Sequence, residues 1–120
     1  MNENATSGQP EKLWSLEKLR GISRGNEAFV QKMFLLFQQQ TQVRLLEMEK
    51  AAAENNFLQV GEIAHKMKPG LETFCIDSLK ESVRSLEKSA ENSEEKNRVQ
   101  LELIVSTLRR VLSEMEAPSV

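Results

Sequence analysis

The chain has 120 residues, of which 39% are hydrophobic and 28% are charged, and its formal net charge at pH 7 is −2. This length suits one domain, and the scattered Lys and Arg form no basic stripe of the kind that binds nucleic acid. With 5 Gly, 3 Pro and no Tyr, the composition argues against many short strands. The single Cys excludes an internal disulfide, the single His excludes a zinc site with two histidines, and no glycine-rich loop suggests ATP binding.

Neither membrane insertion nor secretion is indicated by the sequence. The longest apolar run, residues 33–37, is far too short to cross a bilayer. The first four residues lack the basic start and apolar stretch of a secretion signal. We therefore expect a cytoplasmic protein.

The N-terminal part is predicted to hold a polar lead and one short helix. Residues 1–11 are polar and include Gly8 and Pro10, so we expect a disordered lead or linker there. A short helix is predicted over about residues 13–21, and one side of it carries Leu13, Leu16 and Leu19. A turn follows at residues 23–26, where Asn26 is suited to cap the next helix.

A long helix is predicted over residues 27–54, because nothing in this segment breaks a helix. Apolar or small residues recur at spacings of three and four, at Val30, Met33, Phe37, Thr41, Leu45, Met48 and Ala52. We assign Met33 and Phe37 to the core rather than to a docking surface. Around residues 34–36 the helix is apolar on more than one side, and we expect the first helix to cover this extra surface through Leu16 and Leu19.

Three further amphipathic segments follow. After a turn at Asn55 and Asn56, the most regular stripe consists of Phe57, Val60, Ala64, Met67, Leu71 and Phe74. After a second turn near residues 75–77, the next stripe consists of Leu79, Val83, Leu86 and Ala90. Asn92 and Ser93 stop this stripe and offer caps for the next helix. The last stripe consists of Leu101, Ile104, Val105, Leu108, Val111, Leu112 and Met115, before Pro118.

This pattern predicts an all-α fold, an antiparallel four-helix bundle with a short N-terminal covering helix, over residues 12–117. Four long amphipathic segments joined by connections of a few residues are typical of that architecture. A long two-helix coiled coil is the competing fold, and the caps between the segments argue against it.

His65 is the candidate working residue of the chain. It follows Ala64, so it lies about 100° around the helix from the core stripe, where solvent can reach it. Gly61, one turn before, leaves one ring face bare, and Lys68 can bring a positive charge above the ring. A neutral imidazole is a competent nucleophile, and a nearby cation suits an incoming phosphoryl group. The alternative is an ordinary surface histidine with a tolerated glycine and a solvated lysine, which the spacing alone favours.

The run Ile63-Ala64-His65-Lys66-Met67-Lys68 resembles the phosphorylation-site motif of histidine-containing phosphotransfer (HPt) domains, commonly Ala-His-x-Leu-Lys-Gly. The helix start at residues 25–29, the Asn55-Asn56 turn and the Leu79…Leu86-Glu87 pattern are also similar to that family. The resemblance covers roughly residues 13–115.

The resemblance implies that His65 is the phosphoacceptor, which attacks the phosphoaspartate of a receiver domain and later returns the group to another receiver's aspartate. Lys68 matches the family's lysine near the phosphoryl group, and Ala64 matches the small residue before the histidine. The chain would then be a phosphorelay carrier in two-component signalling, without kinase activity or a cofactor of its own. Magnesium is expected only in the partner receiver domain, and no metal site in this chain.

The expected partners are response-regulator receiver domains, including those of hybrid sensor histidine kinases. Contact with nucleic acid or a membrane is not expected, and the domain should be a monomer. The residues assigned to partner docking are Gly61, Glu62, Lys66, Pro69, Gly70 and Glu72. For Lys66, steering of an acidic receiver pocket and simple solvation are equally favoured.

Two positions depart from the family pattern. Pro69 stands where the family usually has Gly after the lysine, with Gly70 one place later, and Cys75 stands where another Gly is usual. Because Pro69 has no N–H for the carbonyl of His65, we expect a local bend in a helix that continues to about Phe74. Cys75 is expected to be a small buried residue rather than a redox centre.

Two other functions compete with the phosphorelay carrier. One is the phosphoacceptor part of a histidine kinase, in which an acidic residue normally follows the histidine as a base. Here Lys66 follows His65, the sequence shows no acidic base beside it, and no ATP-binding domain follows. The other is a helical adaptor or interaction module in which His65 is incidental.

Overall fold

Five α-helices and two single 3₁₀ turns form the part of the chain that the computed structural model describes, residues 12–116. The α-helices are α1 (Glu17–Ser23), α2 (Glu27–Ala53), α3 (Phe57–Thr73), α4 (Lys80–Glu87) and α5 (Glu94–Glu116). The 3₁₀ turns η1 (Asp77–Leu79) and η2 (Ser89–Glu91) flank α4. No strand occurs in this range. The predicted all-α fold is therefore confirmed.

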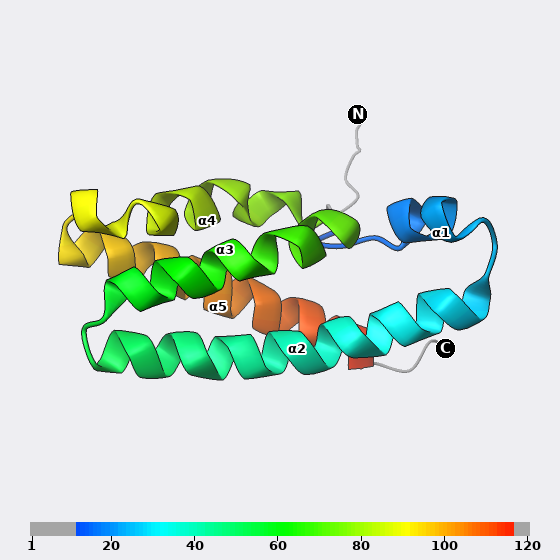
Figure 1. The fold of residues 1–120 in the computed structure, drawn as a ribbon, viewed down its shortest axis with the longest axis horizontal. Helices are drawn as coiled ribbons and strands as arrows, with labels where there is room; N and C mark the ends of the chain where they lie inside the picture. The colour runs from blue at the N-terminus through cyan, green and yellow to red at the C-terminus, as the bar shows by residue number, and fades with distance from the viewer. Residues whose placement is uncertain (1–11, 117–120) are drawn as a thin grey trace, which may run out of the picture.

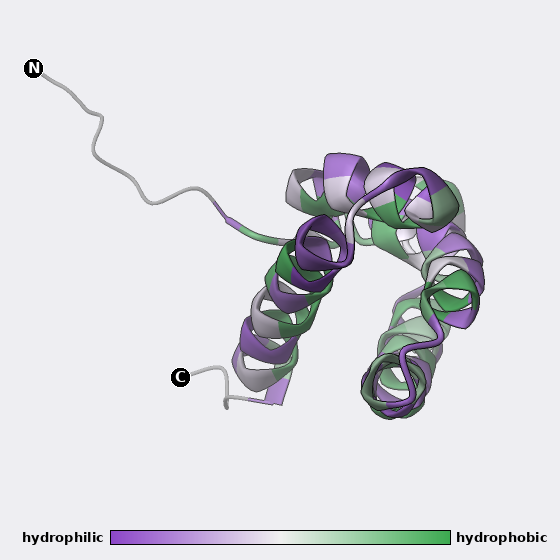
Figure 2. Ribbon diagram, turned by 90° about the vertical axis from the view of Figure 1, so that its left-hand side faces the viewer, coloured by the Kyte–Doolittle hydropathy of each residue, from purple (hydrophilic) through white to green (hydrophobic). Residues whose placement is uncertain are grey.

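Helices α2 to α5 run alternately up and down as an antiparallel bundle, and α1 lies at one end of it (Figure 1). Seen along their length, these helices surround a shared interior (Figure 2). The α3 helix packs against both α2 and α4, which gives the helix that carries His65 a neighbour on each side. None of the described helices has the length and apolar character needed to span a lipid bilayer.

The predicted stripes supply most of the core. On α3, Val60 and Ala64 are fully buried, and Leu71 keeps the same inward face. Along α2 every residue of the predicted stripe is buried except Met33, which is partly buried and still packs against the core. The α5 stripe from Leu101 to Met115 is buried throughout. The three- and four-residue spacing was therefore sufficient to identify the inward faces of the long helices.

The predicted helix caps are also confirmed. The side chains of Asn26 and Asn56 accept hydrogen bonds from backbone N–H groups at the starts of α2 and α3, at 3.0 and 3.2 Å. Ser93 Oγ does the same at the start of α5, at 3.1 Å. Asn55 takes a left-handed conformation with φ 60°, which Asn tolerates better than most residues. These turns separate the helices and exclude a continuous coiled coil.

The first helix begins later than the sequence predicted. Residues 13–16 are not helical; they form a strap across the end of the bundle. The backbone N–H of Ser15 donates to the carbonyl of Phe74 at 2.9 Å, and Trp14 Nε1 donates to Glu114 at 2.8 Å. The ring of Trp14 also lies 5.9 Å from that of Phe34. These contacts hold the segment against the bundle in a non-helical conformation, and helix α1 starts only at Glu17.

The expectation that α1 covers the extra apolar surface near residues 34–36 is wrong for two of the three residues. Phe34 is partly buried, but Leu35 and Leu36 remain exposed. Successive helical residues are about 100° apart, so the inward face defined by Phe34 and Phe37 cannot include the two between them.

Ala90 is exposed, so its predicted place in the core is also wrong. Helix α4 ends at Glu87, and the turn at η2 changes the phase of the pattern. Ser89 is buried instead, and its Oγ donates to the carbonyl of Phe57 at 3.0 Å. The predicted lead at residues 1–11, and the end of the predicted domain at 117, lie outside the described residues.

Candidate functional site

His65 lies in the middle of α3 with its side chain 68% exposed. Its neighbours Ala64 and Met67 are both buried in the core. This is the arrangement predicted from the stripe, and it leaves the imidazole within reach of a partner molecule.

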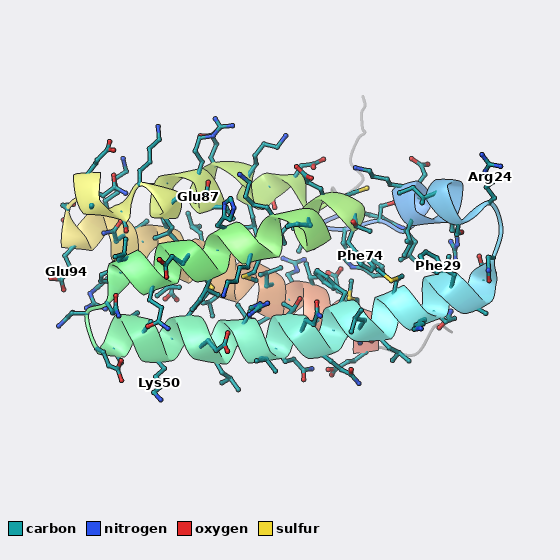
Figure 3. All side chains as sticks on the ribbon, in the orientation of Figure 1. Arg24, Phe29, Lys50, Phe74, Glu87 and Glu94 are labelled. Carbon is teal, nitrogen blue, oxygen red and sulfur yellow. The ribbon has the colours of Figure 1, made fainter. Side chains whose placement is uncertain are left out.

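A carboxylate from the neighbouring helix contacts the ring. Glu87, the last residue of α4, hydrogen-bonds to Nδ1 of His65. Lys68 Nζ, one turn further along α3, lies 3.5 Å from the same Glu87 oxygen, Oε2. Figure 3 labels Glu87 on α4, where it faces α3. The three residues therefore form one cluster, the His65–Glu87–Lys68 cluster, on the surface of the bundle between α3 and α4.

The electrostatics of the cluster keep Glu87 ionised. The hydrogen bond with His65 is the largest effect and lowers the pKa of Glu87 below 4.5. Burial, the second-largest effect, opposes this decrease, and the charge of Lys68 adds to it. An ionised carboxylate can only accept hydrogen bonds. The hydrogen in the contact must then belong to Nδ1 of His65.

This arrangement selects one tautomer of the neutral imidazole. With its proton on Nδ1, the ring has its free electron pair on Nε2. A neutral imidazole with a free ring nitrogen on an exposed surface can act as a nucleophile. The carboxylate also stabilises positive charge that develops on the ring when Nε2 forms a bond, as a buried aspartate does for a catalytic histidine.

The sequence interpretation missed Glu87 as a member of the site. The residue that follows His65 in the sequence is Lys66, not an acid. The acid comes from 22 residues further along, across the interface between α3 and α4. The signal that could have found it is the Leu79…Leu86-Glu87 pattern, combined with the antiparallel pairing of these two helices.

Gly61 does not bare a face of the imidazole, and the docking role assigned to it is wrong. It is buried under α4. A Cβ atom added there would collide with the backbone carbonyl oxygen of Leu86 and lie 3.1 Å from its carbonyl carbon. The glycine is present because the backbone of α4 passes directly over it.

The other residues assigned to docking divide into two groups. Glu62, Lys66, Pro69 and Glu72 are exposed on α3 around His65. Gly70 is partly buried, and a Cβ atom there would lie 3.2 Å from the ring of Phe37. Gly70 therefore faces α2, and its position does not fit a place on the docking face.

The structure accommodates both departures from the family motif, Pro69 within α3 and Cys75 just after it. Helix α3 continues past Pro69 to Thr73, whose hydroxyl donates to the carbonyl of Pro69 at 2.9 Å, and Leu71 stays buried. The predicted continuation is confirmed, and the bend itself stays a prediction. Cys75 is only partly buried and has φ 57°, the left-handed conformation in which glycine is usual at helix ends.

One comparison with known proteins gives a match. The family model of the Hpt domain matches residues 32–117 of the chain. The matched range starts in the second turn of α2 and contains all three residues of the His65–Glu87–Lys68 cluster. Neither the curated proteins nor the solved structures contain a significant match.

Proposed function

The chain belongs to the Hpt domain family. We propose that it carries a phosphoryl group on Nε2 of His65 between receiver domains of a cytoplasmic two-component phosphorelay. Domains of this family transfer phosphoryl groups through a histidine and interact with receiver domains. For this chain we propose three details: the phosphoacceptor is His65, the reacting atom is its Nε2, and the group passes from one receiver domain to another.

The observation that carries the proposal is the contact between Glu87 and Nδ1 of the exposed His65. His65 is the only histidine of the chain, so a histidine phosphotransfer reaction in this chain has one candidate acceptor. The carboxylate on one side of its ring leaves the opposite nitrogen as the nucleophile.

In the proposed reaction, the electron pair on Nε2 attacks the phosphorus of the receiver's aspartyl phosphate. The bond between phosphorus and the aspartate oxygen breaks, and the aspartate leaves as a carboxylate. The proton on Nδ1 stays in the hydrogen bond to Glu87 throughout, so no proton has to leave the ring. Transfer to a second receiver is the reverse of this step.

Lys68 is proposed to stabilise the charge of the phosphoryl group. Its Nζ lies 3.5 Å from Glu87 Oε2, and its side chain is 45% exposed. A flexible lysine at this position can turn toward a phosphoryl group on the ring, since phosphoryl transfer depends chiefly on positioning and charge stabilisation. The chemistry of magnesium is assigned to the receiver domain.

The exposed side chains of Glu62, Lys66, Pro69 and Glu72 surround His65 on α3 and are proposed to meet the receiver domain. Lys66 adds positive charge to this face, which suits an acidic phosphorylation site on the partner.

The test is a phosphotransfer assay with purified components. The chain is incubated either with ATP and magnesium alone or with a phosphorylated receiver domain, and its mass is measured at neutral or basic pH. We expect one acid-labile phosphoryl group with the phosphorylated receiver and none with ATP alone. His65→Gln should abolish the gain while the far-UV circular dichroism stays that of the folded bundle, because the side chain lies outside the core.

The alternatives correspond to other outcomes of the same assay. Labelling by ATP alone would favour the phosphoacceptor part of a histidine kinase. No labelling with any receiver domain of the same organism would favour a helical adaptor.

A further inference from the structure

Gly61 lies one helical turn before His65, where the backbone of α4 lies directly against α3. An added Cβ atom would collide with the carbonyl oxygen of Leu86 and would come within 3.5 Å of the Cα atom of Glu87. The obstacle is the backbone of α4 rather than a flexible side chain. Any side chain at residue 61 must therefore move one helix relative to the other.

Such a movement would reach Glu87 directly, because Leu86 and Glu87 are consecutive residues. One turn earlier on α3, the hydrogen bond from Ser89 Oγ to the carbonyl of Phe57 holds the end of α4 against this helix. Glu87 therefore lies between two residues that contact α3, Leu86 at Gly61 and Ser89 at Phe57. Together these contacts fix the position of its Cα atom against α3. Hydrogen bonds weaken steeply with distance and misalignment, so a displaced Glu87 would lose its contact with His65.

We propose that Gly61 is a positioning residue of the phosphoacceptor site: it lets the backbone of α4 lie directly on α3, and this spacing places Glu87 at Nδ1 of His65. The inference rests on the proposed function for its effect on phosphotransfer. Its structural part, the effect on the tautomer of His65, can be measured without any phosphotransfer.

The first test is ¹⁵N NMR of the imidazole in the wild-type chain, in Gly61→Ala and in Gly21→Ala. Gly21 is the matched control, because it is also helical and a Cβ atom there meets nothing within 4 Å. We expect the proton of neutral His65 on Nδ1 in the wild type and in Gly21→Ala, and a mixture of both tautomers in Gly61→Ala. An unchanged tautomer in a folded Gly61→Ala would overturn the proposal.

The second test separates a role through Glu87 from a general loss of packing. Gly61→Ala is expected to slow transfer from a phosphorylated receiver about tenfold, on the scale of losing one hydrogen bond to a charged group. The same substitution should have little further effect in the background of Glu87→Gln, because residues that act through one contact are not additive. Fully additive effects on the rate would contradict the proposal.

A folded protein is required for both tests, and circular dichroism checks it. If Gly61→Ala unfolds the chain, the substitution is repeated with Gly21→Ala and Cys75→Gly, which should raise the thermal midpoint. Gly21→Ala lowers the backbone entropy of the unfolded chain, and Cys75→Gly relieves the left-handed conformation at residue 75. A chain that stays unfolded there would overturn the proposal, since α4 could then not move aside. A wild-type chain that takes no phosphoryl group would contradict the proposed function, whereas the tautomer comparison would still decide the role of Gly61.

Discussion

Glu87 and His65 are 22 residues apart in the chain, yet the carboxylate of the first accepts a hydrogen bond from Nδ1 of the second. The Glu87 side chain is 23% exposed, so the contact lies at the edge of the bundle, partly shielded from solvent. In the proposed function, this contact makes the reactivity of His65 depend on a residue of another helix.

Glu87→Gln should slow acceptance of a phosphoryl group by His65 by about tenfold, because the neutral amide stabilises charge on the ring less well than a carboxylate. Single-turnover transfer from a phosphorylated receiver measures the rate. Glu81→Gln is a suitable control, since Glu81 is an exposed acid on α4 that pairs with Arg84 instead. Equal rates for wild type and Glu87→Gln would remove Glu87 from the mechanism.

The same pair predicts a dependence of stability on pH. Because the pKa of Glu87 is lowered below 4.5 in the folded chain, its ionised form contributes stability that is fully present above that pH. The contribution is lost as the pH falls through the folded-state pKa. The difference in free energy of unfolding between wild type and Glu87→Gln should therefore shrink as the pH falls from 5 toward 3, by about the loss of one partly exposed ion pair. Urea unfolding at several pH values measures it, and a constant difference would disagree with this account.

Lys68→Ala should slow phosphotransfer but leave the thermal midpoint nearly unchanged. Its pair with Glu87 lies at the surface and is partly exposed, and surface pairs contribute about 0–1 kcal/mol to stability. The positive charge should matter more when a phosphoryl group is present. Lys68→Arg, which keeps the charge, should recover part of the rate. A transfer rate equal to that of the wild type would exclude Lys68 from the reaction.

Cys75→Gly should stabilise the chain by about 1 kcal/mol. A backbone φ of 57° is unfavourable for a residue with a Cβ atom, whereas glycine adopts it without a steric clash. Differential scanning calorimetry should show a higher midpoint for Cys75→Gly than for the wild type. Cys75→Ala is the control and should bring no such gain, since alanine has the same conflict with this conformation. A gain of similar size in both variants would mean that the thiol, rather than the backbone, is the cause.

The sequence was sufficient to predict the long helices, their inward faces, their caps and the exposure of His65, because each of these depends on residues within a few turns of one another. Glu87 was not predicted as a partner of His65, since its position relative to the ring depends on how α4 packs on α3. Gly61 was misassigned for the same reason. The sequence suggests that its missing side chain leaves space beside the imidazole, whereas in the fold that space is occupied by the backbone of α4. The strap at residues 13–16 was predicted as helix because its leucine spacing is helical, while its contacts with Phe74 and Glu114 are tertiary.

The strap also contains the residue whose fluorescence reports on one end of the bundle. Trp14 is the only tryptophan, and the chain has no tyrosine, so its intrinsic emission reports this single position. The indole N–H is bonded to Glu114 and its ring lies beside Phe34, so release of the strap would place the indole in water and shift its emission to longer wavelength. Far-UV circular dichroism instead follows all the helices together. Thermal melts recorded by both signals would therefore reveal whether the strap detaches before the helices unfold or together with them.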